Sequence, residues 1–283
     1  MSNLYLFGDS FTADIPNNET SALNITKQVD KKDVWTYQLA DMLNVKPIFI
    51  SKHGTGLDWC QFQFDRRLKK INKDKDYIVI SHTAPSRRWF VEKSPQCSNF
   101  LNYITPNGEL NKDFLKSMSG MEEIASNGVP SIQQADIGRH YALGVARQEL
   151  EFLYGESIVT YFRHYQNEGY NIINLPCTIE PEQYKIDHNN FETISGLDSV
   201  ARNEFKGSYE NNVSNFTKIT GGADGRVNHL TRGNHKILSE KLYNCFTENC
   251  KLDFTTDFRS NFIQESNWEE HNVLGIHYHN ING

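Results

Sequence analysis

The sequence lacks long apolar runs and an excess of basic residues, and both shortages narrow the classes of protein it can belong to. Only 38% of the 283 residues are hydrophobic, the mean hydropathy is −0.60, and no stretch approaches the length of a membrane span. We therefore expect no membrane partner. The formal net charge is −6, which argues against general nucleic-acid binding because phosphate contacts need clustered Lys and Arg.

Cysteine is also scarce and irregularly spaced. The five cysteines are Cys60, Cys97, Cys177, Cys245 and Cys250. An odd number without regular spacing argues against a disulfide framework and favours reduced thiols in a cytoplasmic setting, with a Cys245–Cys250 pair as the alternative under oxidising conditions. The first residues show no basic segment leading into an apolar one, so we expect no signal peptide. No metal-ligand spacing recurs, and we expect neither a metal nor another cofactor.

What the chain does contain is an alternation of apolar strand-like segments and helical patterns, which predicts an α/β fold. The expected strands are residues 3–7, 46–51, 77–81 and 170–176, and the expected helices are 34–43, 65–71, 132–164, 197–205 and 231–246. An irregular insertion rich in Asn, Ser and Gly covers about 92–130, with a turn at 104–108. We expect one domain over 1–250 and an aromatic-rich extension over 251–283.

The first strand breaks into Gly8-Asp9-Ser10-Phe11-Thr12. A serine at the carboxyl end of a first strand lies where open α/β sheets bind their ligands. If a helix begins there, its free N–H groups would suit a developing oxyanion. The alternative is an ordinary turn, in which Gly, Asp and Ser are all common.

A second segment near the far end of the chain favours the catalytic interpretation. It runs from Val227 to Leu238 and contains His229 and His235. Together the two segments resemble the SGNH, or GDSL-type, hydrolase superfamily. The resemblance implies a three-layer, flavodoxin-like parallel sheet with helices on both faces, Ser10 as nucleophile and His229 as catalytic base. His235 is the rival base, although the family's second histidine is structural.

The third member of the triad departs from the family pattern. The family places an aspartate three residues before the histidine, and here that position holds Arg226. Asp224 could orient His229 instead; otherwise the site works as a Ser-His dyad with a backbone carbonyl on the second ring nitrogen. An orienting carboxylate can contribute up to ~10⁴ in rate in triad enzymes.

The expected oxyanion hole departs as well. The resemblance implies donors at Ser10 N–H and at a glycine after the second strand, for which Gly54 fits and Gly56 is the alternative. The family's third donor, an Asn side chain, falls on Ala84. Thr83, Ser86 or Arg87 could replace it, and we group Asp9, Gly54, Thr83 and Arg87 as oxyanion or substrate residues.

Arg87 has two interpretations, a ligand contact or an ion pair with a surface carboxylate. The Thr83–Arg87 arrangement also resembles divergent, virus-associated members of the superfamily. His53 and His82, at strand ends, are expected beside the site, where they could bind substrate or, with His229, a metal.

These features predict a serine esterase, or acylhydrolase, for a carboxylic ester of a small molecule or glycan, such as an O-acetylated carbohydrate. The alternative is a weakened or inactive fold relative that serves as a structural or binding component of a virion or other assembly. Because the extension carries Phe254, Phe258, Phe262 and Trp268, we expect it to pack on its own domain or on a neighbouring subunit, which would make a homo-oligomer.

Overall fold

A four-stranded parallel sheet forms the centre of the protein. The computed structural model describes residues 2–14, 31–52, 55–83, 87–89, 98–99, 148–177, 196–205 and 229–263. The strands are β1 (Asn3–Gly8), β2 (Lys46–Ser51), β3 (Tyr77–His82) and β6 (Asn171–Pro176), in the order β2-β1-β3-β6. All neighbouring strands are parallel. Each of the four expected strands is confirmed to within one residue at either end.

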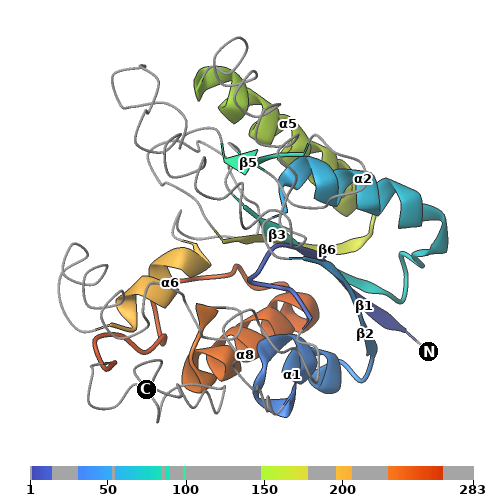
Figure 1. Cartoon of the computed structure of the whole chain (residues 1–283). Helices are drawn as coiled ribbons and strands as arrows, with labels where there is room; N and C mark the ends of the chain where they lie inside the picture. The colour runs from blue at the N-terminus through green and yellow to red at the C-terminus, as the bar shows by residue number, and fades with distance from the viewer. Residues whose placement is uncertain are drawn as a thin grey trace, which may run out of the picture.

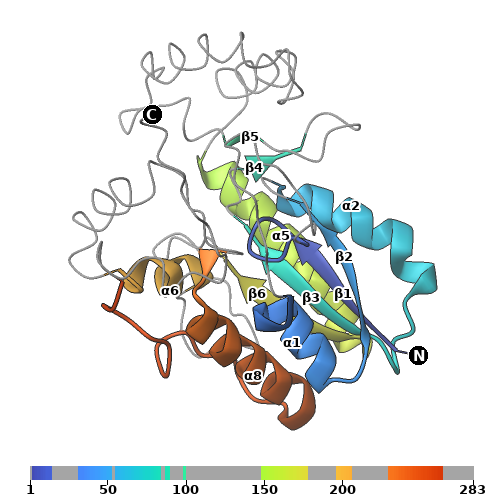
Figure 2. The same cartoon turned by 60° about the horizontal axis from the view of Figure 1, so that its bottom comes forward.

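Helices cover both faces of this sheet (Figure 1). One face carries α1 (Trp35–Met42), α6 (Leu197–Asn203) and α8 (Arg232–Glu248), and the other carries α2 (Leu57–Arg67) and α5 (Gln148–Asn167). Short 3-10 turns, η1 (Lys31–Asp33) and η2 (Leu68–Lys70), precede α1 and follow α2. Figure 2 shows the same separation from a second direction. The expected three-layer α/β class is confirmed.

Strand β1 is apolar from Leu4 to Phe7 because helices cover both faces of the sheet there. Leu4 and Leu6 belong to the core cluster on the α1 and α8 side, whereas Tyr5 and Phe7 belong to the cluster on the α2 and α5 side. A strand buried on both faces reads as a continuous apolar run, which is why this segment could be recognised from the sequence.

The helix predictions were less accurate at their ends. The segment 65–71 was expected as a helix, but α2 begins at Leu57 and the chain past Arg67 continues only as the 3-10 turn η2. Of the long helix expected over 132–164, the described part is α5, which continues to Asn167. Residues 132–147, the turn at 104–108 and most of the insertion lie outside the described residues. A two-stranded antiparallel pair, β4 (Arg87–Arg88) with β5 (Ser98–Asn99), stands where this excursion begins.

The first part of the C-terminal extension packs on its own domain. Leu252 and Phe254 are buried in the same cluster as the inner faces of α1 and α8. Farther on, Ile263 forms a β-bridge with Phe205 and is buried against it. Residues 264–283, with Trp268, are outside the described part of the chain. Among the helices that the structure describes, none combines the length and apolarity needed to cross a membrane.

The strand order places a natural site at the end of β1. The chain leaves β1 for β2 on one side and then returns to β3 on the other side of β1. Loops that diverge in this way leave a crevice at the carboxyl ends of the two central strands, where open α/β sheets bind ligands. Ser10 lies two positions after the end of β1, so it lies at this switch point.

Candidate active site

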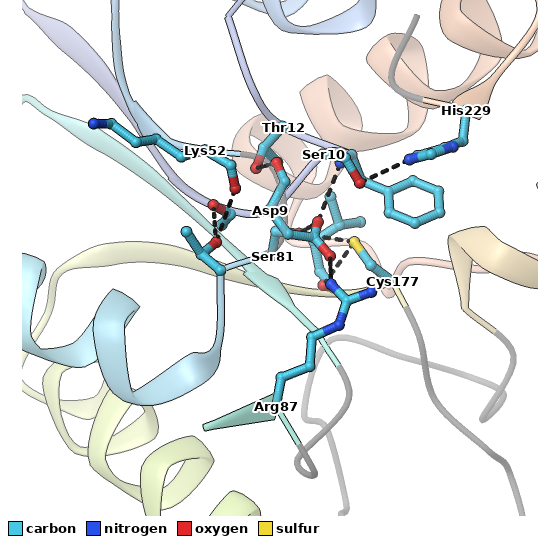
Figure 3. A network of polar contacts seen from close by, with 12 residues as sticks. Asp9, Ser10, Thr12, Lys52, Ser81, Arg87, Cys177 and His229 are labelled. Carbon is cyan, nitrogen blue, oxygen red and sulfur yellow. Dashed lines mark hydrogen bonds and ion pairs between the residues drawn. The ribbon is translucent and has the colours of Figure 1, made fainter. Parts of the chain in front are cut away.

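The structure brings Ser10 and His229 into direct contact although 219 positions separate them in the chain. Ser10 Oγ lies 2.7 Å from His229 Nε2 (Figure 3). Both residues are partly exposed, so a substrate can approach them. A hydroxyl hydrogen-bonded to an imidazole nitrogen is the arrangement of a nucleophile with its general base. The predicted proximity of these two residues is therefore confirmed.

The serine is carried on a tight turn and not at the start of a helix. Asp9 Oδ1 accepts a hydrogen bond from Phe11 N at 3.1 Å, and the Asp9 carbonyl accepts one from Thr12 N at 3.1 Å. Residues 10–12 form this turn and residues 13–14 are irregular. No helix therefore begins within the described residues 10–14, and the expected helix dipole does not act on Ser10 from there. An aspartate that bonds its own following backbone favours a turn over a helix.

Gly8 is required where β1 ends, because the backbone of this turn passes very close to β3. A Cβ at Gly8 would lie 2.2 Å from Ser81 Cβ and 2.5 Å from Thr12 Oγ1, and its φ of +153° is one that other residues rarely adopt. Gly8 therefore permits the close approach between the end of β1 and β3. Ser10 follows on the turn that begins there.

The second histidine of the C-terminal segment has a structural position. His235 is fully buried, and its Nδ1 accepts a hydrogen bond from the backbone N–H of Trp35 at 3.3 Å. This buried contact joins α8 to the start of α1. Of the two candidate bases, His229 contacts Ser10, whereas His235 contacts the backbone of Trp35.

His229 is held in an uncommon backbone conformation. Its φ is +61°, and a residue with a Cβ pays roughly 1–2 kcal/mol to adopt this left-handed region. The ring lies against Phe11, with ring centroids 4.7 Å apart, and the following residue, Leu230, is fully buried in the core. Backbone outliers of this kind persist where the surroundings over-determine them, and they concentrate at functional sites.

A buried polar network lies directly beneath the serine. The carboxylate of Asp9 is buried, and its Oδ2 lies 3.0 Å from Arg87 Nη1 (Figure 3). Ser81 Oγ donates to Asp9 Oδ1 at 3.3 Å and lies 2.9 Å from Cys177 Sγ. Burial, together with the charge of Asp9, raises the pKa of Cys177 well above its usual range, so this cysteine stays a thiol and serves packing.

Of the two interpretations of Arg87, the structure shows the ion pair, although its partner differs from the one expected. It pairs with the buried carboxylate beside the nucleophile and not with a surface group. About a quarter of the Arg87 side chain, 26%, remains exposed. A guanidinium has five N–H donors, and one of them accounts for the Asp9 contact.

Of the remaining residues expected in the oxyanion hole and the triad, the structure describes Thr83 but not Gly54 or Asp224. Thr83 is buried just past the end of β3, and its hydroxyl has no hydrogen-bond partner among the residues that the structure describes. By strand alternation it shares a face with Ser81. Gly54 and Asp224 lie outside the described residues, as do Ala84, Ser86, Arg226 and His53. On either side of Gly54, Lys52 N and Thr55 Oγ1 donate to the carbonyl of Gly8 at 3.0 and 2.7 Å.

His82 does not lie beside Ser10, and that expectation is wrong. It shares its parity along β3 with Ile78 and Ile80, which face α2 and α5. Its Nε2 bonds Asn174 Oδ1 at 2.9 Å, and burial lowers its pKa to about 4. Because alternate side chains of a strand point to opposite faces of the sheet, His82 lies on the other face from His229. The two histidines therefore cannot bind one metal ion together. Within the described ranges no three His, Cys, Asp or Glu side chains are grouped to hold a metal ion.

Sequence reasoning missed one buried carboxylate near the site. Glu204, at the end of α6, is fully buried and hydrogen-bonds Thr231 and Asn234, at the start of α8. Nothing in the local sequence marks it, because a glutamate at the end of a short helix is ordinarily exposed.

Comparison with known proteins adds little to this geometry. No protein-family model matches the chain, and no curated protein sequence matches it either. Among solved structures, it is similar to a protein described as lipolytic, of the G-D-S-L family, from Desulfitobacterium hafniense DCB-2. The identity is 12%, the match covers 68% of this chain and 87% of the other, and the TM-score is 0.24.

A second similar structure is an acetyl xylan esterase from the rumen bacterium Butyrivibrio proteoclasticus. The identity is 13%, the match covers 70% of this chain and 60% of the other, and the TM-score is 0.27. Identities this low and TM-scores below 0.5 carry no inference about function.

Proposed function

We propose that this protein is a serine esterase of the SGNH type that hydrolyses a carboxylic ester. The observation that carries the proposal is the 2.7 Å contact between Ser10 Oγ and His229 Nε2 at the carboxyl edge of the sheet. The buried network of Asp9, Ser81 and Arg87 supports the turn from below. The resemblance of residues 8–12 and 227–238 to the two catalytic blocks of the superfamily supports the same reaction.

In the proposed reaction Ser10 Oγ attacks the ester carbonyl while His229 Nε2 accepts the hydroxyl proton. Collapse of the tetrahedral intermediate breaks the ester C–O bond, and the imidazolium returns that proton to the leaving alcohol. Water then attacks the acyl-enzyme with His229 again as base, which releases the carboxylic acid and regenerates Ser10. No cofactor enters either half of this cycle.

The oxyanion of each tetrahedral intermediate needs donors that are already in place. We assign this role to the Ser10 N–H, the Gly54 N–H and the hydroxyl of Thr83, which is buried and finds no hydrogen-bond partner within the described ranges. Loss of one such donor costs roughly 10²–10³ in rate in serine hydrolases. Asp9 and Arg87 shape the wall below these donors, and Asp224 is our candidate for orienting the imidazole.

For the substrate we propose a short acyl ester of a carbohydrate. The insertion over about 92–130 is polar and rich in Asn and Ser, with aromatic residues among them, and we take this composition to favour a hydroxylated ligand over a long acyl chain.

A fluorophosphonate probe tests the proposed reaction without knowledge of the substrate. Wild type should be labelled at one site, Ser10→Ala should not be labelled, and His229→Ala should be labelled far more slowly. Ser157→Ala is the matched control, because Ser157 is an exposed serine on α5, and it should behave as wild type. Absence of labelling in wild type would refute the esterase and favour the alternative, a non-catalytic binding or assembly module with this fold.

A further inference from the structure

The start of α8 is capped by a carboxylate from another helix. Glu204 lies at the C-terminal end of α6 and is fully buried. One of its oxygens, Oε1, accepts hydrogen bonds from Thr231 N at 3.0 Å, Thr231 Oγ1 at 2.9 Å and Asn234 Nδ2 at 2.7 Å. Thr231 is the N-cap residue of α8, but its side chain caps no N–H of its own helix, since its hydroxyl donates to Glu204.

A carboxylate is the group best suited to this place. The N-terminus of a helix presents unpaired N–H groups and the positive end of the helix dipole, and α8 is 17 residues long. Hydrogen bonds to an ionised acceptor are shorter and about twice as strong as neutral ones. Glu204 therefore holds Thr231 at two atoms, and both the backbone and the side chain of that residue are fixed.

This attachment lies two positions after the candidate catalytic base. His229 keeps a φ of +61°, a conformation that persists only where the surrounding chain restrains it. On the following side the restraints are the burial of Leu230 and the two hydrogen bonds from Thr231 to Glu204. The backbone that follows His229 is thus attached to Glu204.

The C-terminal extension keeps Glu204 from moving away. The carbonyl of Glu204 accepts hydrogen bonds from Phe262 N at 3.1 Å and Ile263 N at 2.9 Å. Asn234 also exchanges hydrogen bonds with the backbone of Arg259, at 2.8 and 3.1 Å. Three parts of the chain that are distant in sequence, namely the end of α6, the start of α8 with the turn before it, and the extension, therefore meet at Glu204.

We propose that Glu204 is a positioning residue for His229: through Thr231 and Asn234 it holds the turn in the strained conformation that aims the imidazole at Ser10. This inference rests on the proposed function, because it assigns Glu204 a part in readying the same nucleophile.

The first measurement is the rate of fluorophosphonate labelling of Ser10 in Glu204→Gln, well below its melting temperature. A misplacement of about 1 Å at a catalytic group can cost ~10²-fold in rate, and we expect a decrease of that order. The matched control is Asp76→Asn. Asp76 is also a buried carboxylate that accepts backbone N–H bonds, from Asn3 and Asn72, but it lies at the opposite end of the sheet, and its variant should label at the wild-type rate.

A second variant covers the case in which Glu204→Gln does not fold. Thr231→Val removes only the hydroxyl bond to Glu204 and keeps the backbone bond, so we expect a smaller decrease, about tenfold. Labelling of either folded variant at the wild-type rate would overturn the proposal. Failure of both to fold, with Asp76→Asn folded, would show that Glu204 serves the fold alone and would overturn it too.

The second measurement does not depend on catalysis. Long-range ¹H–¹⁵N spectra of the histidine rings should show the His229 resonances shifted in Glu204→Gln and unchanged in Asp76→Asn, with buried His82 on the other face as reference. If wild type is not labelled, the esterase proposal fails. These spectra still decide whether Glu204 determines the orientation of the His229 ring. Unchanged His229 resonances in folded Glu204→Gln would refute the positioning role.

Discussion

The buried imidazole of His82 makes a specific prediction about stability below neutral pH. Its ring packs beside Phe162, its Nε2 bonds Asn174, and only 2% of the residue is exposed. Burial lowers its pKa to about 4, with the nearby charge of Arg163 acting in the same direction and the Asn174 bond opposing both. In the unfolded chain the pKa of histidine is about 6.5.

The sign follows from proton binding in the two states. Between pH 6.5 and pH 4 the unfolded chain takes up a proton that folded His82 does not, so the free energy of unfolding falls as the pH falls. The contribution is fully present above pH 6.5 and is lost by pH 4. With the folded pKa at about 4, the loss is on the order of 3 kcal/mol, or roughly 6–12 °C in Tm for a domain of this size.

The assay compares wild type with His82→Gln, whose amide can still donate to Asn174 but does not titrate. Urea unfolding followed by circular dichroism at pH 7.5, 6.5, 5.5 and 4.5 yields the free energy of unfolding of each protein. The variant should be less stable at pH 7.5 because ring packing is lost, and the difference should shrink steadily toward pH 4.5. A difference that stayed constant over this range would refute the assignment of the acid sensitivity to His82.

Three further predictions concern the site and the extension. Arg87→Met leaves the buried Asp9 carboxylate without its ion partner and should lower the free energy of unfolding by about 1–3 kcal/mol; a double-mutant cycle with Asp9→Asn checks this, and a coupling energy near zero would contradict it. If Asp224 orients the imidazole, Asp224→Ala should lower kcat for p-nitrophenyl acetate by up to ~10⁴ with the fold intact, whereas unchanged activity would indicate a dyad. Truncation after Cys250 removes Leu252, which is fully buried, and should cost at least 1.5–3 kcal/mol and, if the extension joins subunits, lower the mass seen by light scattering. The matched control ends at Ile263, and equal stability and mass in the shorter protein would refute the role of the extension.

The layers of the fold were predictable because a strand that is buried on both faces appears in the sequence as a continuous apolar run. The segments that became β1, β2, β3 and β6 are short apolar runs separated by helical patterns, and parallel strands covered by helices must be apolar throughout. The start of α2 was missed because Asp58, Gln61 and Gln63 interrupt the apolar pattern on which helix prediction depends.

The candidate pair was predictable as well, because the segments that carry Ser10 and His229 resemble the two catalytic blocks of the SGNH superfamily, and the first of them also follows from turn chemistry. Gly8 allows the close backbone approach, and Asp9 caps the turn that presents Ser10. Such requirements act within a few residues, so they leave a signature that a single sequence can show.

What lies between these motifs was decided only by the tertiary structure. The sequence places His82 at a strand end near the site, but the pleat turns its side chain to the other face of the sheet. Likewise nothing local reveals that Arg87 pairs with Asp9 or that Glu204 holds Thr231. Local patterns determine which residues form strands, helices and turns, because those depend on near neighbours and burial. The partner of a buried charge is set by which distant segments the packed core brings within hydrogen-bond distance, and that is a property of the whole chain.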